Sequence, residues 1–398
     1  MEHGEHRSCA YGLRHQARCL SAIKSTDGKS SFIIGTQELS RPNEVHLLTF
    51  DEEFFEISTT IFSHPHEIWD ISASKEDPDL FFTCYREVID GKKTQSKASL
   101  WRMKRGYQEQ EEDGVGGGGH EGGMQHHQPR GELEHVLSLD IGDGSVKKVI
   151  WQDSTEVISV EDWRICIWDI DIKQGTAKLT GSIDTPDKGF KFASAVMNPH
   201  AQEVVAVYGR SIQGWNLSSL KPTFTIKDAQ PALLFCVDYN PNRPFQIATG
   251  GDDCKVRIWD VRDISAGPIM TFQDHTHWVW SVAYNKFHDQ LMLTSSSDCQ
   301  VNLQSIVSIS TGAEYKYDGE EASEEDERSA DEDGDQADNV QDPPTDGLVQ
   351  AFDQHEDSVY QVAWSRVDPW LFMSLSHDGR AVMNQVPSEE KFKILLNY

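Results

Sequence analysis

Residues 247–260 read Ile247-Ala248-Thr249-Gly250-Gly251-Asp252-Asp253-Cys254-Lys255-Val256-Arg257-Ile258-Trp259-Asp260. An apolar run leads into a turn rich in Gly and Asp, and a second run alternates apolar with charged side chains before it ends in Trp-Asp. Successive side chains of a β-strand point to opposite faces, so two such runs around a Gly/Asp turn predict an antiparallel hairpin. The same hairpin recurs along the chain.

The recurrence has a regular period. Trp168, Trp215 and Trp259 each end a run and precede Asp or Asn, at separations of 47 and 44 residues. Partial copies of the hairpin, or of its second run, occupy Asn43–Phe50, Ala98–Trp101, Ser297–Gln304 and His377–Asn384. A period of this length indicates an array of small units, each of which buries its apolar faces against its neighbours.

This pattern resembles that of the WD-repeat family. The resemblance implies an all-β fold, a seven-bladed β-propeller of the WD-repeat type. About 330 residues remain when two low-complexity insertions are set aside, which leaves about 47 for each of seven four-stranded blades. Ring closure gives every blade two neighbours and leaves only short outer edges. The strand that closes the ring could come from the N-terminal residues or from the C-terminal run Phe392–Leu396, and we favour the C-terminal run.

The predicted organisation is one domain with two insertions. The expected segments are blades 1 and 2 in residues 8–104, a flexible Gly/His-rich loop in 105–131, blades 3 to 6 in 132–309, a disordered acidic insertion in 310–347, and blade 7 with the closing strand in 348–398. The acidic insertion has too few apolar residues to offset the entropy cost of ordering it. The histidines of the first loop lack Cys or acidic partners at the spacing that zinc requires, so we predict no metal and no cofactor.

The chain is strongly acidic. Its formal net charge is −29, and residues 318–346 contain fourteen acidic side chains against Arg328 as the single basic one. The remainder is still negative and shows no run of Lys or Arg, which argues against nucleic acid as a partner. Seven cysteines without a Cys-x-x-Cys pair indicate a reducing compartment, and no window is apolar enough for a membrane span. We therefore expect a cytoplasmic protein that does not insert into a membrane.

Polar side chains at matching positions of the blades are interpreted as structural. The candidates are Asp253 and Trp259 in blade 5, His275 and Asp298 in blade 6, and His355 and Asp378 in blade 7. A turn Asp, a loop His, a strand Ser or Thr and a strand Trp can satisfy one another by hydrogen bonds inside a blade. A catalytic triad is needed once, whereas this set recurs, so we predict no enzyme and no catalytic residue.

Aromatic residues recur in one register of the first strands. They are Trp69, Phe235, Trp280 and Tyr360, and Trp278 lies two residues before the third of them. In WD-repeat propellers the start of this strand lies near the narrow end of the ring, where peptides commonly dock, so these five residues are candidates for protein binding. Packing between blades is the alternative explanation of the same residues, and the sequence leaves both open.

Several strings resemble one branch of the WD-repeat proteins beyond what the fold requires. They are Gly35-Thr36-Gln37, Glu67-Ile68-Trp69, Gly250–Val256, His277–Trp280, His355–Tyr360 and Asp368–Phe372. From about residue 11 to the C-terminus the chain is similar to the EARP- and GARP-interacting protein family. The resemblance implies a non-catalytic scaffold, monomeric within larger complexes, that binds multisubunit vesicle-tethering complexes. It also implies roles in endosomal recycling and endosome-to-Golgi transport, with recruitment to endosomes and the trans-Golgi network.

Two further functions stay open as alternatives. Trp259-Asp260-Val261-Arg262 resembles the box through which some propellers dock onto adaptors of cullin-RING ubiquitin ligases, with Arg262 as the residue that the fold does not explain. The net charge and the acidic insertion would also suit a binder of histones or other basic proteins. Ser323 and Ser329 are each followed three residues later by an acid, which makes them candidates for phosphorylation by acidophilic kinases.

Overall fold

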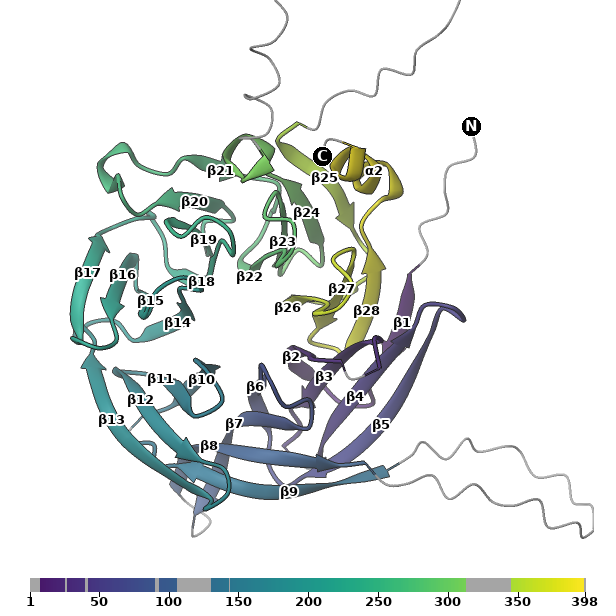
Figure 1. The fold of residues 1–398 in the computed structure, drawn as a ribbon, viewed down its shortest axis with the longest axis vertical. Helices are drawn as coiled ribbons and strands as arrows, with labels where there is room; N and C mark the ends of the chain where they lie inside the picture. The colour runs from purple at the N-terminus through teal and green to yellow at the C-terminus, as the bar shows by residue number, and fades with distance from the viewer. Residues whose placement is uncertain are drawn as a thin grey trace, which may run out of the picture.

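The computed structural model describes residues 8–25, 27–39, 42–89, 93–105, 130–142, 144–312 and 345–396. Their twenty-eight strands form five four-stranded sheets and one sheet of eight strands, arranged as a ring around a central axis (Figure 1). The sheet of eight strands consists of two four-stranded halves, so the ring contains seven four-stranded units, which we number as blades. The prediction of an all-β propeller is thereby confirmed.

The blades follow one another in chain order. Blade 1 holds β2 (Ala17–Ile23), β3 (Ser30–Thr36), β4 (Asn43–Asp51) and β5 (Glu56–His64), and blade 2 holds β6 (Ile68–Ala73), β7 (Leu80–Ile89), β8 (Lys93–Lys104) and β9 (Arg130–Leu139). Blade 3 holds β10 (Val146–Trp151), β11 (Glu156–Glu161), β12 (Arg164–Asp171) and β13 (Thr176–Asp184), and blade 4 holds β14 (Phe192–Met197), β15 (Glu203–Tyr208), β16 (Ser211–Asn216) and β17 (Lys221–Ile226).

The remaining blades complete the ring. Blade 5 holds β18 (Leu234–Tyr239), β19 (Gln246–Gly251), β20 (Val256–Asp260) and β21 (Met270–Phe272), and blade 6 holds β22 (Val279–Tyr284), β23 (Leu291–Ser296), β24 (Val301–Ser305) and β25 (Gly347–Phe352). Blade 7 holds β26 (Val359–Trp364), β27 (Leu371–Ser376), β28 (Arg380–Gln385) and β1 (Cys9–Gly12). Two short 3₁₀ helices, η1 (Ile264–Ala266) and η2 (Val307–Ile309), and the helix α2 (Ser388–Leu396) lie outside the sheets.

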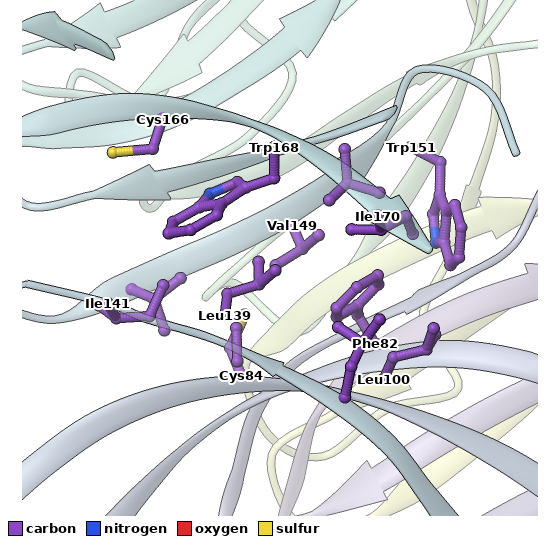
Figure 2. Packing of buried hydrophobic residues seen from close by; sticks show 14 of the residues in the cluster. Phe82, Cys84, Leu100, Leu139, Ile141, Val149, Trp151, Cys166, Trp168 and Ile170 are labelled. Atoms are coloured by element: carbon purple, nitrogen blue, oxygen red, sulfur yellow. The ribbon is translucent and has the colours of Figure 1, made fainter. Parts of the chain in front are cut away.

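The core lies between neighbouring blades and not inside any one of them. The innermost strands β2, β6, β10, β14, β18, β22 and β26 each contact the next around the axis, and β26 contacts β2. Between blades 2 and 3, Phe82 packs against Trp151 with ring centroids 5.2 Å apart, and Val149 lies in the same cluster (Figure 2). Fully burying a side chain such as Phe82 stabilises the fold by about 1.5–3 kcal/mol, so each blade depends on its neighbours.

Blades 1 and 2 are joined by a pairing that the other blades lack in the described residues. The start of β9 pairs in parallel with β5, with Ile61 opposite Arg130 and Phe62 opposite Gly131. A Cβ at Gly131 would overlap the ring of Phe62, so only glycine allows this close approach. The parallel pairing unites the two blades into one sheet of eight strands.

The strand that closes the ring comes from the N-terminus, so the prediction of a C-terminal closing strand is wrong. β1 pairs antiparallel with β28, with Cys9 opposite Met383 and Gly12 opposite Arg380. Residues 388–396 form α2 instead, because acidic residues in its first turn favour a helix N-terminus and Ile394 is buried against the cluster between blades 6 and 7. An apolar run of this length suits either structure, and tertiary packing decided between them.

Two predicted boundaries also shift. The prediction had blade 3 begin at residue 132. Residues 130–139 instead form β9, the last strand of blade 2, so blade 3 begins later in the chain. The prediction had blade 7 begin at residue 348. Residues 347–352 instead form β25, the last strand of blade 6, so blade 7 also begins later. In both cases the insertion precedes the last strand of a blade, and the sequence analysis had placed it between blades.

Candidate protein-binding site at the upper mouth of the channel

Each innermost strand shifts its register at its second residue. The seven residues at these β-bulges are Arg18, Trp69, Lys147, Ala193, Phe235, Trp280 and Tyr360. A bulge leaves one residue out of the ladder and redirects its side chain. All seven line one cavity of about 460 Å³ where the innermost strands begin. We call this end of the central channel the upper mouth.

Aromatic side chains from blades 5 and 6 form one side of the upper mouth. Phe235 and Trp280 stack with centroids 4.8 Å apart and planes 18° apart, and Trp278 lies edge-on to Trp280 at 5.8 Å. Trp278 is 44% exposed, and Trp280 donates its indole N–H to the hydroxyl of Ser297 at 2.6 Å. We call Phe235, Trp278 and Trp280 the aromatic arc. Phe235 and Trp280 line the cavity, Trp278 lies beside them, and Val279, between the two tryptophans in sequence, is buried between blades.

The two other candidate aromatic residues are covered by arginine. The guanidinium of Arg18 lies 4.6 Å from the ring centroid of Tyr360 and 5.4 Å from that of Trp69. Arg86 approaches Trp69 at 4.5 Å. Cation–π contacts of this kind hold both partners in place. Arginine therefore covers two of the five candidate aromatic residues, and the other three form the aromatic arc. Arg18 is a site residue that was not predicted from the sequence.

Lysines from blade 3 and from the loop before blade 4 form the opposite side. The buried carboxylate of Asp162 accepts hydrogen bonds from Lys191 at 2.7 Å and pairs with Lys147 at 3.0 Å, and Lys148 lines the same cavity. Burial opposes ionisation of Asp162, but the two ammonium groups outweigh it and keep its pKa below the usual range. We call Lys147, Lys148 and Lys191 the lysine arc. The sequence shows no such cluster because its members are distant along the chain.

Asp70 lies below the lysine arc in the wall of the cavity. Burial raises the pKa of this carboxyl to about 6, and nearby Lys148 partly offsets the rise. Among the described residues, no donor lies within hydrogen-bond distance of its Oδ2 atom. A buried carboxylate with an unpaired oxygen is costly, so Asp70 takes up a proton at a higher pH than an exposed carboxyl does and is ionised at neutral pH.

The loops around the upper mouth expose further apolar side chains. Trp163 is 38% exposed in the turn between β11 and β12, and Lys191 lies over its ring at 5.5 Å. Phe190 and Leu233 are each 41% exposed just before β14 and β18. These residues could not be predicted from the sequence, because single apolar residues in loops carry no periodic signal.

The recurring polar residues lie inside the blades. In blade 6, His275 contacts Asp298 at 3.0 Å and Thr294 at 2.8 Å, and Gln304 bonds to Asp274 at 3.0 Å. In blade 5, Trp259 and Gln230 both donate to Thr249, at 3.0 and 3.1 Å. Asp253 does not join that set and pairs with Arg257 at 2.7 Å.

Blade 7 contains a Ser, His and Asp arrangement whose residue types are those of a catalytic triad. His355 lies between Ser374 at 2.7 Å and Ser376 at 2.8 Å, and Ser376 bonds to Asp378 at 2.5 Å. Both serines and the histidine are buried, and burial lowers the pKa of His355 to about 4. His355 therefore stays neutral at physiological pH, and no substrate can reach this histidine or the two serines without opening the blade.

A matching set in blade 2 was not identified from the sequence. Thr83 accepts a hydrogen bond from the indole of Trp101 at 2.8 Å and contacts His64 at 3.2 Å. Burial lowers the pKa of His64 to about 4. The signal was present in the sequence, since His64 stands ahead of a first strand as His275 and His355 do.

The remaining sequence candidates lie elsewhere. Arg262 follows β20 at the opposite end of the channel, where it is 61% exposed, pairs with its neighbour Asp260 and covers the ring of Phe245 at 4.5 Å. Ser323, Ser329 and the Gly/His-rich residues 114–127 lie outside the described residues. Within the described ranges no group of His, Cys, Asp or Glu side chains is arranged to hold a metal ion. The helices of that part of the chain are too short or too polar to cross a membrane.

Comparison with known proteins agrees with the propeller fold. The model of the family described as EIPR1 beta-propeller matches residues 5–304, and the WD domain, G-beta repeat matches residues 347–383. An EARP-interacting protein homolog from Gekko japonicus is 37% identical, and the EARP and GARP complex-interacting protein 1 of Homo sapiens is 36% identical, each over 97% of this chain and 98% of the relative. The WD repeat-containing protein DWA2 of Arabidopsis thaliana is 30% identical over 94% of this chain and 95% of the relative. The chain therefore belongs to the EIPR1 family of WD-repeat β-propellers.

Proposed function

We propose that this protein is a non-catalytic adaptor that binds vesicle-tethering complexes of the EARP and GARP type through its upper mouth. In this role it acts in endosomal recycling and endosome-to-Golgi transport and is recruited to endosomes and the trans-Golgi network by its partners. The relatives named for interaction with these complexes share nearly the whole length of the chain, which supports the partner class.

The observation that carries the choice of surface is the aromatic arc. Large apolar side chains are usually buried, and exposed clusters of them on a soluble protein mark interaction sites. Trp278 is 44% exposed beside the stacked pair Phe235 and Trp280, at the mouth of a cavity. Aromatic residues in such positions dominate the energetics of protein interfaces.

The test is recovery of tethering-complex subunits with the full-length protein from membrane-containing lysate. Trp278→Ala is expected to reduce recovery severalfold while leaving the melting temperature nearly unchanged, because its side chain supports little packing. Phe54→Ala is the matched control, since Phe54 is 69% exposed but lies in the turn between β4 and β5, away from the mouth. Absence of tethering subunits from the wild-type sample would refute the proposal.

Trp280→Ala and Tyr360→Ala separate binding from packing. Both side chains are half-buried, and both lie at bulge positions that face the channel. Loss of the partner without a change in melting temperature assigns these residues to recognition. Loss of both would assign them to the core.

A second candidate function rests on the exposure of Arg262. A guanidinium that is 61% exposed at the end of β20 is accessible to an adaptor of a cullin-RING ubiquitin ligase. Arg262→Ala is then expected to abolish adaptor binding and leave the fold intact, because exposed ion pairs contribute little to stability. Unchanged adaptor binding in this variant eliminates the candidate.

A further inference from the structure

The upper mouth carries a local surplus of positive charge on a strongly acidic protein. Arg18 and the three side chains of the lysine arc contribute four positive charges, and Asp70 and Asp162 contribute two negative ones, which leaves a surplus of two. The formal net charge of the whole chain is −29. A cluster of one sign in a concave site raises the local concentration of ligands of the opposite sign.

The positive side chains are held in place before any ligand binds. Asp162 is only 3% exposed and fixes two ammonium groups that are themselves 38% and 51% exposed. Each lysine has three N–H donors and therefore keeps donors for a further acceptor. Arg18 is held between Tyr360 and Trp69. Fixed donors lose less conformational freedom when a ligand binds, which favours affinity.

Blade 4 provides a passage between the lysine arc and the aromatic arc. Its bulge residue is Ala193, whereas the neighbouring bulges carry Lys147 in blade 3 and Phe235 in blade 5. The methyl group of Ala193 is the smallest of the seven side chains at this level of the channel and leaves room above it. A ligand that crosses blade 4 meets lysines at one end and aromatic rings at the other.

We propose that the upper mouth recognises an acidic peptide segment that carries an apolar side chain. The carboxylates bind the lysine arc, the chain crosses Ala193, and the apolar side chain packs against the aromatic arc. This inference rests on the proposed function for the place of binding and adds the chemical class of the segment that is bound. A single-stranded nucleic acid fits less well, because its dense phosphate charge is repelled by the acidic remainder of the chain.

The direct test measures binding of a fluorescein-labelled, glutamate-rich peptide with a single central phenylalanine to the full-length protein by fluorescence anisotropy. Wild-type protein is expected to bind it, with affinity that falls as salt rises. Replacing the glutamates by glutamine, or the phenylalanine by glycine, is expected to weaken binding by about tenfold in each case. Equal binding of the glutamine peptide overturns the proposal, as does stronger binding of a single-stranded oligonucleotide.

Variants of the protein test the same contacts from the other side. Lys148→Gln removes one positive charge, and Lys147→Gln combined with Lys191→Gln and Asp162→Asn removes the ammonium groups without leaving a buried carboxylate unpaired. Both are expected to weaken peptide binding by about tenfold and to reduce its salt dependence. Lys178→Gln with Lys221→Gln is the control, because both lysines are exposed on the outermost strands of blades 3 and 4. Ala193→Leu is expected to block the passage.

The results distinguish failure of this inference from failure of the proposed function. If wild-type protein recovers tethering subunits and the lysine variants recover them equally well, the ligand class is wrong and the proposed function stands. If wild-type protein binds the acidic peptide through the lysine arc but recovers no tethering subunits, the ligand class stands and the proposed function fails. Circular dichroism spectra and melting temperatures matched to wild type are required of every variant.

Discussion

The two ends of the central channel are built from the same seven strands and are used differently. At the upper mouth, bulges turn one side chain of each innermost strand into a cavity, where aromatic rings and lysines remain partly exposed. At the lower mouth, where these strands end, a second cavity of about 570 Å³ is present. There the polar groups are mainly engaged in bonds between blades.

Bonds between blades at the lower mouth come from side chains at the strand ends. Trp151 of blade 3 donates its indole N–H to the Ser72 carbonyl of blade 2, and Trp364 of blade 7 donates to the Ala283 carbonyl of blade 6, both at 3.0 Å. Arg366 reaches from blade 7 past blade 1 to the Ser74 carbonyl of blade 2 at 2.7 Å. Each blade buries its apolar faces only against its neighbours, and apolar packing is non-directional. These hydrogen bonds therefore help to fix the orientation of each blade relative to the next.

One strand therefore contributes to stability at its lower end and, in the proposed function, to recognition at its upper end. Its central residues are buried between blades, its last residues fasten neighbouring blades, and its second residue points into the upper mouth. Substitutions at the lower end should therefore change stability, and substitutions at the upper end should change binding.

The largest expected effect is that of Trp364→Ala. The side chain is 5% exposed and packs against Phe372 at 5.4 Å, so its removal should cost about 3–5 kcal/mol of unfolding free energy. Trp278→Ala at the upper mouth should cost less than about 0.5 kcal/mol. Urea denaturation of both variants measures the difference. Equal destabilisation by the two substitutions would contradict the assignment of stability to the lower mouth and of binding to the upper mouth.

Arg366→Met should have the next largest effect. Burial lowers the pKa of this guanidinium to about 10, so it remains charged at neutral pH, and its bonds to blade 2 disappear in the variant. Hydrogen bonds to charged groups contribute about 1.5–3 kcal/mol, and we expect a loss in that range by urea denaturation. Arg210→Met is the control, since Arg210 forms an exposed ion pair with Asp228. If the Arg366 variant loses no more unfolding free energy than the control, Arg366 does not stabilise the fold in this way.

His355→Gln should change how stability depends on pH. The pKa of this histidine is about 4 in the folded protein and 6.5 ordinarily, so the unfolded chain binds more protons between these values. The wild-type protein therefore loses stability as pH falls from 6.5 to 4, and the variant should lose less, by about 1.4 kcal/mol per pH unit. Parallel pH profiles for the two proteins would contradict this account.

Asp70→Asn should give the smallest effect and the opposite sign. The pKa of Asp70 is raised to about 6 by burial, so the folded protein holds a proton that the unfolded chain has released between pH 3.8 and 6. This contribution to stability is complete below pH 3.8 and is lost as pH rises through 6. The variant should therefore be more stable than wild type by at most about 3 kcal/mol at pH 7.5 and gain less at pH 5. A destabilised variant at pH 7.5 would show that the ionised carboxylate is needed.

Much of the fold follows from residues that are close together in the sequence. The hairpin predicted for residues 247–260 is present as the antiparallel pair β19 and β20, with Ile247 opposite Trp259. Trp168 and Trp215 lie in the third strands of blades 3 and 4, and β12 continues to Asp171 whereas β16 ends one residue after Trp215. The aromatic residues Phe235 and Trp280 could be aligned because each is the second residue of a strand with the same apolar pattern.

Part of the candidate site was beyond the reach of sequence reasoning. Arg18 and Lys191 lie far apart in the chain, and only ring closure brings blade 1 back beside blade 7 and the lysine arc across the channel from Tyr360. The bulges that aim these side chains leave no signature in composition or period. Asp162 likewise reads as an ordinary turn residue until Lys147 and Lys191 converge on it.

The amino-acid sequence by itself determined the repeating unit, because the alternation of side chains along a strand and the Gly/Asp turns act over a few residues. Tertiary structure alone decided which terminus closes the ring: β1 could pair with β28 only once seven blades had curved back on themselves, and α2 found its buried place beside blades 6 and 7. The upper mouth has the same origin. Its charged and aromatic side chains come from strands that are distant in the sequence, and they form one surface only when packing has placed these strands around one axis.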